Sequence, residues 1–332
     1  MDNKNNRKLI WITLSILILM IVILSAFVDL DALLDILKGI YKGWLLIGVA
    51  FLLMGIMLIT IRWRFFLPEK PSFQITFHSN SVSYMLKLLL PIPLAVIRLP
   101  ILTMVSSVNF YQSAPMMVIE RFLELIMRLV ALTLAIVLIL DVPLWIVGVV
   151  VFAILLLAIP AFMMWFSKNA STAIPRIVER SAQLSDMNKK KLREAMVDFQ
   201  NNLSTMRATR GLTTGVLYSL GMWGLFLLFY ITGFYSLGLD LDIMQIIAMS
   251  ATILAVLPPS TPATIGVYQG IIVAILLVFG QLDVNTATAY GFLIIGSQLV
   301  VWIILGVWGL KKTDIKISKL SQVSLDEQDT TT

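Results

Sequence analysis

Charged side chains inside apolar stretches are the residues of this sequence best suited to do chemistry. Arg121, Glu124 and Arg128 follow an i, i+3, i+7 spacing, so a helix places them on one face, where Glu124 and Arg128 can also pair at i, i+4. Arg98 stands in another apolar run, five residues after Pro93. Ionisable groups are costly inside a membrane and usually face the interior of a helix bundle. The pattern therefore predicts a polar interior in which these residues bind an anionic substrate.

Some neighbouring charges also fit a position at the membrane interface. Glu120 and Arg121 stand at the start of their apolar run, where both can lie at the level of the lipid headgroups. Arg62, Trp63 and Arg64 close a different apolar run, and an aromatic ring between two cations is typical of an interfacial anchor. We expect this triplet to face lipid headgroups, including anionic ones.

The stretch LAVLPPSTPATIGVYQG, residues 254–270, interrupts an apolar region with prolines and hydroxyl groups. Broken backbone in hydrocarbon leaves polar groups that cost several kcal/mol each, so it survives only inside protein or beside a wet cavity. Proline stops a helix, hydroxyl groups can bond the freed carbonyls, and a new helix start favours an anion. One interpretation is a binding site, and the other is a structural turn sealed by neighbouring helices. The candidate substrate-binding residues here are Ser260, Thr261, Thr264, Gly266 and Gln269.

Composition indicates the kind of element that must position these groups. The 332 residues are 59% hydrophobic and only 13% charged, against about 25% charged in soluble domains. The sequence therefore predicts an all-α polytopic integral membrane protein. It contains no cysteine, a single histidine (His78) without a partner pattern, and no nucleotide-binding motif. We expect no cofactor, no metal and no catalytic site.

Eight apolar regions make up the predicted architecture. A bilayer needs about 20 apolar residues per helix, and six segments meet this length: 9–28, 44–61, 116–140, 144–166, 212–236 and 286–309. Two further regions, 73–107 and 243–280, are split by prolines. Their arms of about 15 to 18 residues, roughly 22–27 Å, predict re-entrant hairpins that enter and leave on one side. The alternative is two ordinary spans with a short turn at the far surface.

Lys and Arg set the predicted orientation, because cytoplasmic connections are rich in them. The basic residues gather at the N-terminus, after the second span, in 168–210 and after residue 309, whereas the other short connections carry aspartates. This predicts a multi-pass protein of the cell membrane with both termini cytoplasmic. The placement of the formal charge of +6 argues against nucleic acid as a partner.

Two halves of inverted topology follow from this orientation. Residues 1–140 and 141–310 each read as span, span, hairpin, span, but they begin on opposite sides. Residues 167–211 are predicted to form a cytoplasmic amphipathic insert, and 311–332 a disordered tail. Proline-interrupted segments at corresponding positions of two inverted halves indicate the binding site of a transporter.

Four stretches, in this order and spacing, resemble one family. They are Ile61–Arg64, Asn80 with the run Leu90 to Arg98, Ile119–Glu124, and Leu257–Gln269. The chain resembles, over nearly its whole length, the transmembrane flippase-like region of the lysylphosphatidylglycerol synthase family, including its short members. The resemblance implies translocation of aminoacylated phosphatidylglycerol, other phospholipids or polyprenyl phosphates. Because the chain ends about 20 residues after its last span, we expect the aminoacyl-transferring domain to be absent.

Two positions depart from the family's usual pattern. After the first proline the family usually has Gly-Glu, whereas this chain has Ala95-Val96 and keeps Arg98. Gln269 stands where a later Glu is expected. The loss of both carboxylates disfavours a mechanism built on proton coupling or on a cationic headgroup. A plain anion as substrate is less affected.

The sequence thus predicts a flippase or transporter for an anionic phospholipid or polyprenyl phosphate. The headgroup would pass between the two breaks, near Arg98 and the helix start at Ala263. The alternative is a membrane subunit without transport activity that docks a separate lipid-modifying or glycosyltransferase enzyme through residues 168–210. An intramembrane enzyme is disfavoured because the chain has one His, no Cys and no paired interior carboxylates.

Overall fold

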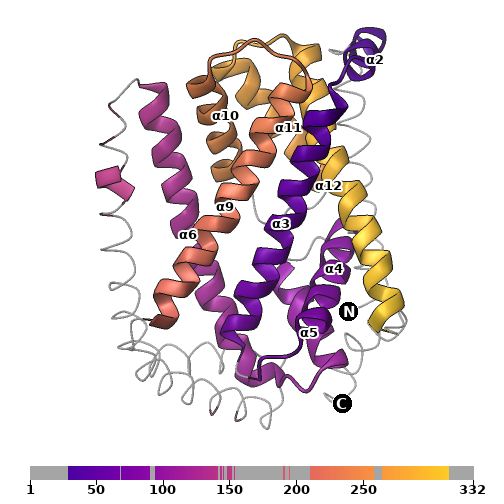
Figure 1. Ribbon diagram of the computed structural model, residues 1–332, viewed down its shortest axis with the longest axis vertical. Coiled ribbons are helices and arrows are strands. Elements are labelled where there is room, and N and C mark those ends of the chain that lie inside the picture. The colour runs from indigo at the N-terminus through magenta and orange to yellow at the C-terminus, as the bar shows by residue number, and fades with distance from the viewer. Residues whose placement is uncertain are drawn as a thin grey trace.

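The computed structural model describes residues 29–67, 69–89, 94–140, 143, 145, 148–151, 153, 190, 194, 210–257 and 264–313. Several predicted segments lie wholly or mostly outside these residues: the first span 9–28, the span 144–166, the insert 167–211 and the tail 311–332. Both proline breaks also lie outside them. The regular elements of the described residues are all helices (Figure 1).

Four long helices match four of the predicted spans. They are α3 (Lys42–Phe66), α6 (Phe110–Ile139), α9 (Arg210–Ser236) and α12 (Val284–Thr313), and they run along the long axis of the molecule (Figure 1). Each contains a stretch long and apolar enough to cross a membrane. α6 begins six residues before the predicted span, and α12 continues into the first residues of the predicted tail. The large apolar side chains on their outer faces, such as Leu46, Leu125 and Ile304, suit contact with lipid.

Three helices start directly after an aspartate that lies in a connection between predicted spans. Asp29 precedes the short helix α2 (Leu30–Lys38) and accepts hydrogen bonds from the backbone of Asp31 and Ala32 at 3.0 and 3.2 Å. Asp242 caps α10 (Ile243–Val256) in the same way, and Asp283 precedes α12. A side-chain oxygen at this position satisfies N–H groups that have no partner within the helix.

Each proline-interrupted region forms two helices. The first consists of α4 (Phe73–Leu89) and α5 (Leu94–Val105), and the second of α10 and α11 (Thr264–Phe279). The two helices of each pair pack against each other. α4 and α5 lie in the lower half of Figure 1, and α10 and α11 in the upper half.

The two predicted halves, residues 1–140 and 141–310, show the same pattern of helix contacts. α4 packs along α12 and α10 packs along α6, while α5 contacts α6 and α11 contacts α12. α3 and α9 pack together at the centre, where glycines allow a close approach. A Cβ atom at Gly48 would lie 2.5 Å from Thr232 Oγ1, and one at Gly55 would lie 2.5 Å from the Phe226 ring. This arrangement brings both pairs of short helices around the α3–α9 contact.

Candidate functional site

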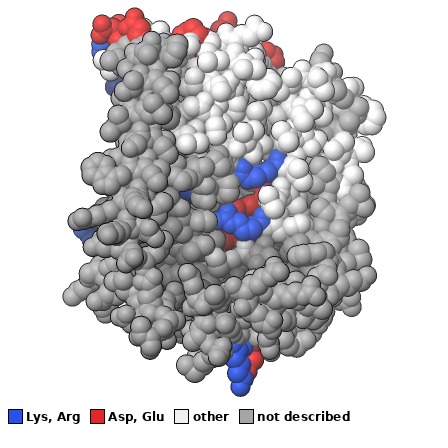
Figure 2. Space-filling view, turned by 180° about the vertical axis from the view of Figure 1, so that it is seen from behind, with Lys and Arg blue, Asp and Glu red and all other residues white. Residues whose placement is uncertain are grey.

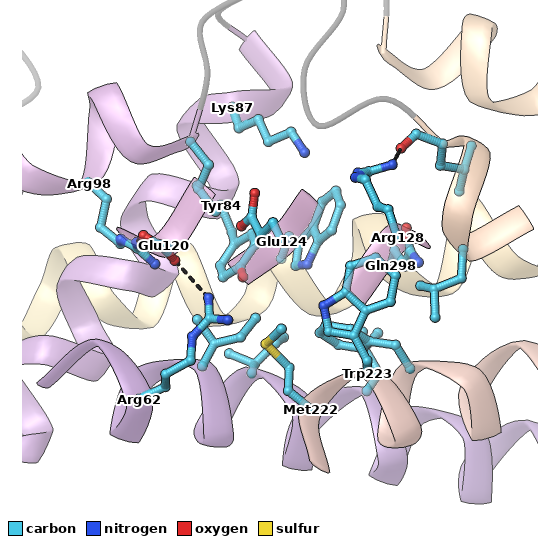
Figure 3. Close-up of a pocket in the computed structure, with 18 of the residues that line it drawn as sticks. Arg62, Tyr84, Lys87, Arg98, Glu120, Glu124, Arg128, Met222, Trp223 and Gln298 are labelled. Carbon is cyan, nitrogen blue, oxygen red and sulfur yellow. Dashed lines mark hydrogen bonds and ion pairs between the residues drawn. The ribbon is translucent and has the colours of Figure 1, made fainter. Parts of the chain in front are cut away.

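A cavity of about 180 Å³ lies between the two pairs of short helices and the long helices around them. Figure 2 shows basic and acidic side chains gathered in a hollow midway along the molecule, and Figure 3 shows the cavity in close-up. Its aromatic wall contains Tyr84, Trp223, Tyr230, Tyr268 and Trp302. Its charged lining residues are Arg62, Lys87, Arg98, Glu120, Arg121, Glu124 and Arg128.

The described lining has five cations and two carboxylates, an excess of three positive charges. An interior with this charge attracts anions, because the surrounding helices screen charge much less than water does. No group of three or more His, Asp or Glu among the described residues is arranged to hold a metal ion. The lining is therefore better suited to an anion than to a cation.

Glu120 holds two arginines in the most deeply buried part of the lining. Its Oε1 accepts a hydrogen bond from Arg62 Nη2 at 3.0 Å, and its Oε2 accepts one from Arg98 Nη2. Both arginine side chains are 1% exposed, and that of Glu120 is 4% exposed. Arg62 also donates to Ser219 Oγ at 3.0 Å, and the Arg98 guanidinium lies 4.0 Å from the centre of the Trp63 ring. We call Arg62, Arg98 and Glu120 the closed cluster.

The closed cluster joins α3, α5 and α6, and through Ser219 it also joins α9. The expectation of an interfacial anchor is therefore wrong for Arg62 and Trp63, which are buried. Glu120 is buried as well, so it does not lie at headgroup level. Arg64 is exposed, and its Nε donates to the carbonyl of Pro71 at 2.6 Å. The sequence prediction missed Arg62 and Glu120 as lining residues, because their pairing joins positions 58 residues apart.

Arg121, Glu124 and Arg128 all line the cavity, but their pairing differs from the expected one. Arg121 Nη1 donates to Glu124 Oε2 at 2.7 Å, while Arg128 turns away from Glu124. Arg128 Nη1 donates to the backbone carbonyls of Ala255 and Leu257, at 2.8 and 2.5 Å. The last carbonyls of a helix lack partners within the helix and form the negative end of its dipole, so a cation is stabilised there. Arg128 thus ties α6 to the end of α10.

Lys87 is a lining residue that the predicted site did not include. It lies in the last turn of α4, near the first break. Its Nζ lies 5.8 Å from the centre of the Tyr268 ring and 5.6 Å from that of Trp302. Within the described part of the chain, it makes no hydrogen bond or ion pair. The signal that could have identified it is a lysine set among apolar residues three positions before Leu90.

One of three comparisons with known proteins gives a match. A model of the family described as "Lysylphosphatidylglycerol synthase TM region" matches residues 10–309. This chain belongs to that family. Comparison with curated proteins gives no match, and neither does comparison with solved structures. Membership confirms the resemblance read from the sequence, and with the four apolar helices it supports a location in a membrane.

Gln269, a predicted substrate-binding residue, is turned away from the cavity. Gln269 is 3% exposed and donates from Nε2 to the carbonyl of Thr288 at 2.9 Å. Its amide packs against Gly291, where a Cβ atom would lie 2.6 Å away. Gln269 therefore joins α11 to α12 and does not line the cavity.

The other candidate residues of the second break are only partly described. Gly266 is buried in the first turn of α11 and is not among the cavity-lining residues. Thr264 begins α11, but its side chain lies outside the described residues, as do Ser260, Thr261 and the side chain of Val96. The structure thus gathers Arg98, Arg121, Glu124 and Arg128 around one cavity. Their role in substrate binding stays a prediction.

Proposed function

We propose that this protein moves an anionic lipid between the leaflets of the cell membrane, with the headgroup passing through the cavity. The observation that carries the proposal is the excess positive charge of a cavity that is lined by apolar helices. The main barrier to lipid translocation is removal of the charged headgroup from water, since a charge in hydrocarbon is very unfavourable. Cations and water in a protein cavity lower that barrier while the acyl chains stay in the bilayer.

We further infer six full spans and two re-entrant hairpins arranged as an inverted repeat. α4 and α5 have 17 and 12 residues and α10 and α11 have 14 and 16, so they extend about 18–26 Å, less than a hydrocarbon core of about 30 Å. The matched packing of α4 on α12 and of α10 on α6 supports a two-fold relation between the halves. The distribution of Lys and Arg supports cytoplasmic termini.

The proposed activity contains no covalent step, so the protein acts as a transporter and not as an enzyme. Its partner is an anionic membrane lipid. Docking of a separate lipid-modifying enzyme through residues 168–210 stays a prediction, because most of that surface lies outside the described residues.

The experiment is a scrambling assay on the purified full chain. The protein is reconstituted into vesicles carrying fluorescent phosphatidylglycerol or a fluorescent polyprenyl phosphate in both leaflets, and dithionite then bleaches the outer leaflet. We expect bleaching well beyond one half for at least one lipid, with protein-free vesicles stopping near one half. The assay is run with and without a proton gradient. Folded protein that stops near one half for both lipids under both conditions would contradict the proposal.

A further inference from the structure

The unpartnered buried groups of the cavity wall are all hydrogen-bond donors. Among the described residues, the cavity-lining side chains with buried polar atoms that lack a partner are Arg98, through Nε and Nη1, and Trp302, through Nε1. Trp302 is 9% exposed and Arg98 is 1% exposed. Buried donors are normally satisfied, so an unsatisfied set of one kind points to a missing acceptor. A ligand that completes this wall must be rich in acceptor oxygens.

Lys87 and Arg128 lie where they can bind such a ligand. Figure 3 shows Lys87 extending from α4 toward the side of the cavity on which Arg128 lies. Arg128 uses Nη1 for the two carbonyls of α10, and no described residue accepts a hydrogen bond from its Nε or Nη2. Lys87 Nζ contacts only aromatic rings in the described part of the chain, one of them the ring of Trp302. Donors from α4, α6 and α12 therefore line the same space.

The charges indicate what kind of oxygen-rich group fits. Glu120 is bound by two arginines and Glu124 by Arg121. Neither Lys87 nor Arg128 forms an ion pair with a described carboxylate, and both share the charge of Glu124 with Arg121. A phosphomonoester carries a charge of about −1.5 to −2 near pH 7, with three terminal oxygens as acceptors. A phosphodiester carries a single negative charge and has two terminal oxygens. Lys87, Arg128 and Arg121 share the single carboxylate of Glu124, and the two positive charges left over match the phosphomonoester better.

The size of the cavity indicates a compact headgroup. Its volume is about 180 Å³. Sites that enclose drug-sized ligands usually measure about 300–1,000 Å³. A phosphate group with a few waters fits this space, whereas an aminoacyl-glycerol headgroup is larger and adds an ammonium group to a wall that is already positive.

On the basis of the transport function proposed above, we infer that the ligand is a lipid with a phosphomonoester headgroup, bound by Lys87, Arg128 and Trp302. Lys87 Nζ, Arg128 Nε and Nη2, and Trp302 Nε1 donate to the phosphate oxygens. Arg98 stays bound to Glu120 through Nη2, and its unpartnered Nε and Nη1 add two further donors to the same lining. The bound phosphate links the end of α4 to the end of α10 through Arg128, so it connects the two broken regions.

The test is a binding measurement by native mass spectrometry on the full chain in detergent. The probes are short-chain phosphatidic acid, phosphatidylglycerol with the same acyl chains, and inorganic phosphate. We expect phosphatidic acid to bind about ten-fold more tightly than phosphatidylglycerol, as the gain of one charge-assisted hydrogen bond predicts. Lys87→Gln and Arg128→Gln should each weaken binding of phosphatidic acid about ten-fold. Trp302→Phe, which keeps the ring and removes the donor, should weaken it less.

Two control variants make the result specific. Lys311→Gln removes an exposed lysine at the end of α12 and should leave the affinity for phosphatidic acid unchanged. Lys87→Arg keeps the charge and should restore most of the affinity that Lys87→Gln loses. A thermal unfolding curve for each variant separates loss of binding from loss of folding.

The outcomes separate this inference from the proposed function. Equal affinity of the parent protein for the two lipids would overturn the preference for a phosphomonoester. Unchanged binding in both Lys87→Gln and Arg128→Gln would overturn the site. Inorganic phosphate that binds as tightly as phosphatidic acid would identify free phosphate as the ligand and overturn the lipid. If phosphatidic acid binds in a Lys87-dependent manner but no lipid crosses in the scrambling assay, the site stands and the transport function fails.

Discussion

Two sets of charges line the same cavity but differ in their partners. In the closed cluster, Arg62, Arg98 and Glu120 bind one another and are almost fully buried. Lys87 and Arg128, which we call the open pair, have no carboxylate partner among the described residues and face the cavity. Ionisable residues inside a membrane are expected to be functional. The comparison shows that such residues fall into two kinds, one that fixes helices and one that is available to a ligand.

The difference follows from what each charge needs in order to be buried. A fully buried arginine requires a carboxylate with good geometry, because its removal from water is very unfavourable. Glu120 supplies this for two arginines at once, and the result joins three helices. Lys87 and Arg128 border a space that can hold water, so they stay charged without a carboxylate. Substitutions in the closed cluster should therefore reduce folding stability most. Substitutions in the open pair should reduce ligand binding, and at Arg128 they should also loosen the end of α10.

The largest effect is expected for Glu120→Gln. This change leaves two buried guanidinium groups without their carboxylate, and breaking a buried ion pair costs about 3–5 kcal/mol. We expect the free energy of unfolding in detergent to fall by that amount, or the protein not to fold. The matched control is Glu124→Gln, since the Arg121–Glu124 pair is partly exposed and should contribute only about 1 kcal/mol. Equal losses in the two variants would contradict the structural role of the closed cluster.

Arg128→Gln is expected to loosen the end of α10. The guanidinium donates to the carbonyls of Ala255 and Leu257, and hydrogen bonds from a charged donor contribute about 1.5–3 kcal/mol. Hydrogen exchange of the amides in the last turn of α10 should become about ten-fold faster or more, while exchange in α3 stays the same. Arg64→Gln is the control, because Arg64 is exposed and contacts only the carbonyl of Pro71. Unchanged exchange in α10 would show that Arg128 does not hold this helix.

Gly291→Ala tests the packing of Gln269 between α11 and α12. This contact involves neither the closed cluster nor the open pair. The new methyl group would meet the Gln269 amide at about 2.6 Å, and overpacking of this kind costs about 1–3 kcal/mol. We expect a lower melting temperature with unchanged binding of phosphatidic acid. Gly296→Ala lies on the same helix with nothing within 4 Å of the new methyl group, so it should be neutral or slightly stabilising. A loss of phosphatidic acid binding in Gly291→Ala would show that the packing of Gln269 affects the cavity.

The smallest effect is expected at Asp283, far from both charged sets. Burial alone would raise the pKa of this carboxyl, but hydrogen bonds from Thr286 and Asn285 outweigh it and lower the pKa below its usual 3.8. A lowered pKa in the folded state contributes stability above the unfolded pKa, and this stability is lost as the pH falls through the folded pKa.

Asp283→Asn keeps the N-cap and removes only its charge. The parent protein should be more stable than this variant by about 0.3–1 kcal/mol at pH 7, and the difference should be smaller at pH 3, below the unfolded pKa. Thermal unfolding at the two pH values measures the difference. A larger difference at pH 3 than at pH 7 would contradict the assigned direction of the pKa.

Local patterns in the sequence predicted the long helices and part of the cavity. Apolar runs of about 20 residues predicted four helices that the structure contains, and helical spacing placed Arg121, Glu124 and Arg128 on one side of α6. The partners were not predictable, because spacing along a helix reveals only neighbours within one or two turns. Arg62 pairs 58 positions away, and Arg128 binds carbonyls 127 and 129 positions away. Gln269 was read as a substrate ligand, whereas its partner Thr288 lies on the next helix.

The measurement that tests the central claim most directly is the rate at which labelled phosphatidic acid crosses vesicles containing Lys87→Gln or Lys311→Gln protein. Both variants remove one lysine, but only Lys87 belongs to the open pair. With equal melting temperatures, we predict transfer at least about ten-fold slower for Lys87→Gln and unchanged transfer for Lys311→Gln. Equal rates in the two variants would contradict the claim that the open pair carries the phosphate through the membrane.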